Sequence, residues 1–154
     1  MKKLLLPLVL IFLGTTLSAQ SADDYIEIVR SVLDTEKKAA IAEVMQLTTE
    51  QGDIFWPLYK EYTDKAYTIQ SKRIKIIKDF AENYEKITDE KANQIWTDYL
   101  KYRQEMLNLN KQYFKKFKKQ LPAGLVVKFF QTENKIAALV DFQLADQIPF
   151  IETK

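Results

Sequence analysis

The residue types that carry out most side-chain catalysis and metal binding are missing from this chain of 154 residues. It contains no histidine and no cysteine, which removes the commonest general base, the commonest metal ligand and every thiol nucleophile. Its three glycines are too few for a glycine-rich phosphate loop, and neither a histidine-based triad nor a zinc-protease motif occurs. The sequence therefore predicts a protein that is not an enzyme, with no catalytic residue, no metal site and no cofactor.

A run of lysines and aromatic residues is the densest group that could bind another molecule. In residues 111–119 five lysines alternate with three aromatic rings. A cationic, aromatic surface of this kind can capture unfolded or acidic polypeptide, whereas the regular spacing of the rings favours a buried stripe with lysines on its solvated face. The candidate client-binding residues are Tyr113, Phe114, Lys115, Lys116, Phe117, Lys118 and Lys119.

Two of the three arginines are placed to form an ion pair between helices. Arg73 and Arg103 interrupt apolar stripes, and Glu133 interrupts another. Because a guanidinium pairs bidentately with a carboxylate at partly buried positions, we expect Glu133 to pair with Arg73 or Arg103 and to fix the last helix. The alternative places these side chains at the stripe edges in solvent, where ion pairs contribute little. The role is structural in both cases.

Four amphipathic helices must position these side chains. Apolar residues recur three and four positions apart, and no run alternates with a period of two. The predicted helices span about residues 23–45, 48–84, 88–121 and 122–147. The second and third are long and are joined by a short connection, which makes them antiparallel neighbours. The predicted fold class is all-α, a long bent antiparallel helical hairpin with two flanking helices.

Local signals mark where these helices start and bend. After Leu47, the side chains of Thr48 and Gln51 are spaced to form a capping box, and Thr88 is placed to cap the third helix. Pro57 lies inside the second helix and is expected to bend it, because proline lacks an N–H donor and crowds the preceding turn. The pair at residues 34–35, Asp-Thr, could interrupt the first helix.

The first twenty residues have the pattern of a secretory signal peptide. A basic start is followed by an apolar run at residues 4–13 and a small, polar exit, with cleavage expected after Ala19 or Gln20. The predicted single helical domain of residues 21–154 is therefore periplasmic or secreted, with no integral membrane segment. It holds 21 basic and 21 acidic residues, and this zero net charge argues against nucleic acid as a partner.

The motif at the start of the second helix resembles a known family. Leu47-Thr48-Thr49-Glu50-Gln51 matches the LTxxQ motif of the CpxP/Spy superfamily of bacterial periplasmic proteins. The second copy of that motif corresponds to residues 87–91, where Lys91 stands in place of the glutamine. The resemblance extends over about residues 45–150 in architecture, with few matching residues.

The resemblance implies a bent helical hairpin that dimerises into a shallow cradle. Members act as ATP-independent chaperones, as inhibitory partners of envelope-stress sensors, or as metal-responsive proteins that use histidine or clustered methionine ligands. The last role is disfavoured here because the chain has no histidine and three methionines. The expected function is non-enzymatic capture of unfolded polypeptide by a homodimer, and the alternative is a dedicated adaptor for one envelope protein.

Overall fold

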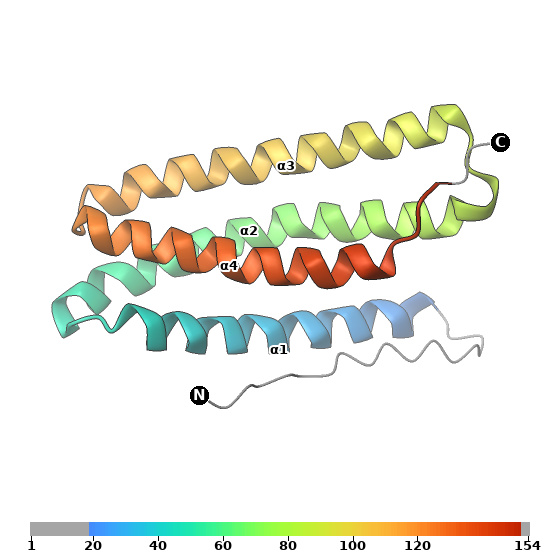
Figure 1. The fold of residues 1–154 in the computed structure, drawn as a ribbon. Coiled ribbons are helices and arrows are strands. Elements are labelled where there is room, and N and C mark those ends of the chain that lie inside the picture. Colours follow the sequence, from blue (N-terminus) through green and yellow to red (C-terminus); the bar gives the residue numbers. More distant parts are fainter. Residues whose placement is uncertain (1–18, 152–154) are drawn as a thin grey trace. The chain divides into compact units, whose positions relative to one another are not determined.

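The computed structural model describes the backbone of residues 19–151 and the side-chain exposure of residues 30–151, Asp146 excepted. Its contacts divide the chain into two units, Met1–Lys38 and Ala39–Lys154, which are considered separately (Figure 1). Most of the predicted signal peptide lies outside the described residues. The predicted boundary at residue 20 and the predicted single domain stay predictions.

The described residues are almost entirely helical and contain no strand, which confirms the all-α class. In the first unit, α1 runs through Asp34 without a break, because the Thr35 hydroxyl donates to the Ser31 carbonyl one turn earlier, at 2.9 Å. In the second unit, α3 ends three residues before the predicted end, since Pro122 disfavours helical backbone in the residue before it. The elements are α1 Ala19–Met45, α2 Thr49–Asn83, the 3₁₀ turn η1 Tyr84–Lys86, α3 Asp89–Lys118 and α4 Ala123–Gln147.

The start of α2 carries the predicted capping box. The Gln51 N–H donates to Thr48 Oγ1 at 3.3 Å, and the Thr48 N–H donates to Gln51 Oε1 at 3.2 Å. The start of α3 has only half of this arrangement, in which the Lys91 N–H donates to Thr88 Oγ1 at 3.2 Å. The Lys91 ammonium instead lies 2.6 Å from the Asp79 carboxylate of α2. The residue that departs from the LTxxQ pattern therefore joins α2 to α3.

In the second unit, α2 and α3 lie side by side and run antiparallel, and α4 packs against α3 (Figure 1). Two ion pairs between α2 and α3 agree with this antiparallel arrangement. Lys116 Nζ lies 2.7 Å from Glu61 Oε1, and Lys72 Nζ lies 2.6 Å from Glu105 Oε2. Pro57 lies inside α2, and Figure 1 shows the first turns of that helix inclined to the remainder.

The packed core is concentrated toward one end of this unit. It joins the end of α1, the first half of α2, the second half of α3 and the first half of α4. Phe129 of α4 touches Phe55 of α2 at 5.2 Å and Phe117 of α3 at 5.1 Å between ring centroids, which are distances typical of favourable aromatic pairs. The buried cluster comprises Ile41, Met45, Phe55, Tyr59, Tyr62, Ala66, Leu109, Tyr113, Phe117, Leu121, Val126 and Phe129.

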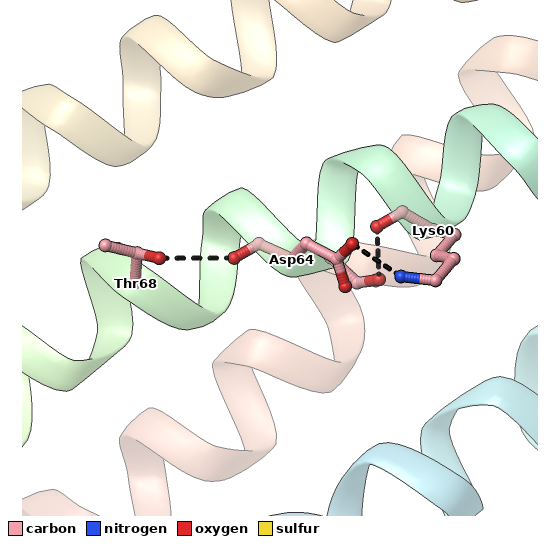
Figure 2. A network of polar contacts seen from close by, with 4 residues as sticks. Lys60, Asp64 and Thr68 are labelled. Carbon is pink, nitrogen blue, oxygen red and sulfur yellow. Dashed lines mark hydrogen bonds and ion pairs between the residues drawn. The ribbon is translucent and has the colours of Figure 1, made fainter.

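The exposed side of α2 is held by contacts between successive turns. Lys60 Nζ lies 2.7 Å from Asp64 Oδ2, and the Thr68 hydroxyl donates to the Asp64 carbonyl at 3.3 Å (Figure 2). Pairs four residues apart on a solvated helix contribute only a few tenths of a kcal/mol each. This network supports the helix and offers no arrangement for chemistry.

Candidate functional site

The rings of the lysine-aromatic run belong to the core. Tyr113 and Phe117 are fully buried, with 0% of their surface exposed. Phe114 is partly buried and packs against Phe130 of α4 at 5.7 Å between centroids. The hypothesis that these three rings form a client-binding surface is wrong for the folded chain, because the rings fill the space between α2, α3 and α4. Their spacing of three and four residues was the correct guide.

The lysines of the same run face outward, with one exception. Lys115, Lys118 and Lys119 are exposed, and Lys118 Nζ lies 5.4 Å from the centroid of the Phe114 ring. Lys116 instead forms the ion pair with Glu61 of α2. The Lys116 ammonium lowers the pKa of the Glu61 carboxyl to about 2. Lys116 is therefore a structural residue, and the other three remain available to a partner.

The prediction that Glu133 pairs with Arg73 or Arg103 is wrong, because the acid that contacts both arginines is Asp141. Arg73 Nη1 lies 2.6 Å from Asp141 Oδ1, and Arg103 Nη1 lies 3.4 Å from Asp141 Oδ2. One carboxylate of α4 thus joins α2 and α3. Glu133 is buried and accepts a hydrogen bond from the Tyr62 hydroxyl at 3.3 Å.

The positions of the helices along one another explain why Asp141, and not Glu133, contacts the arginines. Glu133 lies level with Tyr62, and Arg73 is eleven residues further along α2, which is roughly 16 Å at 1.5 Å per residue. A side chain on α4 must be displaced by a similar length to reach Arg73. Asp141 lies eight residues beyond Glu133, about 12 Å along α4, and the long side chain of Arg73 spans the remaining distance.

An exposed apolar stripe on α3 is one of two groups of exposed apolar side chains in the described helices of the second unit, the other being Leu139 and Phe142 of α4. Trp96 is 61% exposed, Leu100 51% and Leu107 46%, and their spacing of four and seven residues places them on one face of the helix. We call these three residues the α3 stripe. Single exposed apolar side chains are normal on monomeric proteins, whereas several on one helix face make that face a candidate interaction site.

The rings beside the stripe are ordered by stacking. Trp96 stacks on Tyr99 at 5.3 Å between centroids, with an interplanar angle of 30°. The Arg103 guanidinium lies 6.0 Å from the centroid of the Tyr99 ring, and the same guanidinium contacts Asp141. The indole of Trp96 is therefore held at the surface by a chain of contacts that reaches α4.

The sequence offered a signal for this surface. The spacing of apolar residues three and four positions apart predicts a core side of the third helix that includes Trp96 and Tyr99, but Trp96 is 61% exposed. Leu100 and Leu107 follow Trp96 by four and eleven residues and lie on the same exposed face. On a helix that already packs against α2 and α4, a further exposed apolar face is the expected mark of an interface.

The described residues contain no group of three or more histidine, cysteine, aspartate or glutamate side chains that could hold a metal ion. A shallow hollow of about 240 Å³ lies between α2 and α3, and its floor includes the buried ring of Tyr102. Its other lining residues are Lys72, Lys75, Ile76, Asp98 and Lys101. None of the described helices is long and apolar enough to span a bilayer.

Comparison with known proteins leaves the family open. The chain matches no protein-family model, no curated protein and no solved structure. The resemblance to the CpxP/Spy superfamily therefore stays a prediction that depends on the motif at Leu47–Gln51 and its position at the start of a long helix.

Proposed function

We propose that this protein is an exported, non-enzymatic binding protein that captures exposed segments of unfolded polypeptide without using ATP. The observation that carries the proposal is the α3 stripe, in which Trp96, Leu100 and Leu107 are each about half exposed or more. A folded chain gains nothing from holding three large apolar side chains in water. A client that covers them supplies the missing apolar contact.

The size of the stripe suits weak and reversible binding. Full burial of one large apolar side chain contributes about 1.5–3 kcal/mol, and these three are already half covered. Association itself costs several kcal/mol of translational and rotational freedom. The net binding free energy from one stripe is therefore small, so a client is held loosely and can dissociate to fold.

A CpxP/Spy-like arrangement would raise the effective affinity. In this proposal α2 and α3 form the bent antiparallel hairpin, and two copies place their stripes in one shallow cradle. Two weak sites on one assembly bind a long client far more tightly than either site alone.

The second candidate function is an adaptor for one folded envelope protein. It is favoured by the order of Trp96, Tyr99 and Arg103, because preorganised tryptophan, tyrosine and arginine side chains dominate specific interfaces. The chaperone binds many unfolded chains, whereas the adaptor binds one partner at a fixed ratio.

Aggregation of a chemically unfolded client, followed by light scattering without nucleotide, tests the proposal. The full chain should suppress scattering near one dimer per client, and Trp96→Ser with Leu100→Ser should remove most of that effect. Leu139→Ser is the matched control because it removes an exposed leucine of α4 outside the stripe. A substitution at Phe117 is unsuitable, since loss of that buried ring destabilises the core by about 3–5 kcal/mol and would alter the assay for that reason alone.

Equal suppression by the stripe variant and the native chain would contradict the assignment of the stripe. No suppression at stoichiometric excess would contradict the chaperone proposal. A pull-down from envelope extract then separates the two functions, because a single stoichiometric partner supports the adaptor and a mixture of many proteins supports the chaperone.

A further inference from the structure

The charges of this chain are distributed unevenly, although its net charge is close to zero. Residues 106–132 contain six lysines and no acid. The rest of the chain carries 17 basic and 21 acidic residues. This acid-free stretch forms the second half of α3, the turn at residues 119–122 and the first turns of α4. The positive charge is therefore concentrated at the α3–α4 corner, at one end of the second unit (Figure 1).

Most of these lysines have no partner in the described part of the chain. All but Lys116 are exposed, and Lys116 alone forms an ion pair, with Glu61. Lys118 lies over the Phe114 ring. The remaining four have neither an ion pair nor a side-chain hydrogen bond with any described residue. We call the five exposed residues the lysine corner: Lys111, Lys115, Lys118, Lys119 and Lys128.

Helix stability explains only part of this cluster. Lysines in the last turn of α3 lie near the negative end of the helix dipole and are favoured there. Lys111 lies two turns earlier, and Lys128 lies in the second turn of α4, near the positive end of that helix. Neither position gains from the dipole.

Exposed apolar and small side chains lie within the same corner. Val127 is 41% exposed next to Lys128, and Pro122, Ala123 and Gly124 are exposed at the turn. A Cβ atom at Gly124 would meet no atom of the described residues within 4 Å, so this position is open. Lysines around an open, weakly apolar tip match the chemistry of the headgroup region of a bilayer.

We propose that the lysine corner docks this protein on an anionic lipid surface, with the turn at residues 119–122 and Val127 shallowly inserted among the headgroups. Charge complementarity is the main contribution, since a lysine near an anionic bilayer strengthens binding by about fivefold. Five lysines together strengthen it on the order of a thousandfold. The α3 stripe lies on other residues, so this inference is independent of the proposed function.

Binding to lipid vesicles tests the inference. Sedimentation with vesicles of phosphatidylcholine, alone or mixed with phosphatidylglycerol, gives the affinity of the full chain. Replacement of Lys111, Lys115 and Lys128 by glutamine should weaken binding to anionic vesicles on the order of a hundredfold. The matched control replaces Lys75, Lys86 and Lys101 by glutamine, which removes the same charge from exposed positions elsewhere. That control should stay within a few-fold of the native chain.

A fluorescent dye at a single position shows whether the lysine corner itself contacts the vesicle. This separates it from binding through the mainly apolar residues 1–20, which all variants share. The chain has no cysteine, so Val127→Cys and Glu82→Cys each carry one environment-sensitive dye. The dye at Val127 should shift to shorter wavelength with anionic vesicles, and the dye at the exposed Glu82 position of α2 should not.

Three results would overturn the proposal. The first is equal binding to neutral and anionic vesicles, and the second is an equal loss in the two triple variants. The third is a spectral shift at Val127 with soluble polyglutamate but not with vesicles, which would assign the corner to an acidic polypeptide instead.

Discussion

The lysine at position 116 shows how a single contact changes the role of a residue. Five lysines of the 111–119 run look alike in the sequence, and among the described residues only Lys116 reaches an acid, Glu61 of α2. That contact lowers the pKa of the Glu61 carboxyl to about 2, from a usual value of 4.5. The pair connects α2 to α3 at the level of the buried Tyr113 ring, which Lys116 Nζ approaches to 4.7 Å.

The pKa of Glu61 gives a signed pH dependence. Because the pKa is lower in the folded than in the unfolded chain, the carboxylate stabilises the fold above about pH 4.5, and this stabilisation is lost as the pH falls toward 2. We expect Glu61→Gln to lower stability at pH 7 and to match the native chain near pH 2. Urea unfolding across this range, with carbon-13 titration of the carboxyl, measures both. A Glu61 pKa that stays near 2 in Lys116→Met would show that the Lys116 ammonium is not the cause of the shift.

The hydroxyl of Tyr62 is a second residue whose effect can be isolated. Burial raises the pKa of this phenol, so it stays protonated and bonds to Asn110 Oδ1 at 2.9 Å and Glu133 Oε2 at 3.3 Å. We expect Tyr62→Phe to lower the free energy of unfolding by about 1–3 kcal/mol, because buried polar groups lose their partner. Tyr102→Phe is the control: its ring is buried, and its hydroxyl forms no bond within the described chain. Similar losses in both variants would show that the hydrogen bonds contribute nothing.

At the scale of whole helices, the local features were predictable and the pairings between helices were not. The capping box at Thr48 and Gln51 involves residues three apart, so the sequence alone determines it. The burial of Phe117 followed from its spacing. The choice of Asp141 over Glu133 depends on how far α4 is displaced along α2 and α3, which no local pattern records. The exposure of Trp96 was missed for the same reason, because it depends on which faces of α3 have neighbours.

The Asp141 carboxylate is expected to hold the second half of α4 in place. It contacts Arg73 and Arg103, whereas the first half of α4 is held by buried aromatic packing. We expect Asp141→Asn to cost about 1 kcal/mol and to raise hydrogen exchange in residues 134–147 but not in 123–133. Asp64→Asn is the control. It breaks an exposed ion pair within α2 (Figure 2) and should lower the free energy of unfolding by only a few tenths of a kcal/mol. Equal exchange along α4 in the Asp141 variant would contradict this division of the helix.

At the scale of the whole second unit, one half of the helices is tightly packed and the other half buries few large side chains. Around Phe117 and Phe129, α2, α3 and α4 bury their aromatic rings completely. Toward the start of α3, Tyr102 is the only large side chain that is buried in the described residues of that helix before Leu109. The α3 stripe lies in this second, more weakly packed half. A surface that must fit varied chains belongs where side chains can rearrange at low cost.

This distribution predicts two levels of protection within one helix. Amides at residues 109–117 of α3 should exchange only through global unfolding, and those at 92–100 through a smaller opening of lower free energy. Helix length cannot explain such a difference, because both segments belong to α3. Phe129→Ala supplies the decisive perturbation, since loss of a buried ring costs about 3–5 kcal/mol. In this variant the opening free energy measured at residues 109–117 should fall by about 3–5 kcal/mol. The opening free energy at residues 92–100 should stay almost unchanged, as long as it remains smaller than the free energy of global unfolding. Native-state hydrogen exchange resolves both segments. If both lost protection equally, the unit would open as one body, and binding at the α3 stripe would have to occur on a rigid surface.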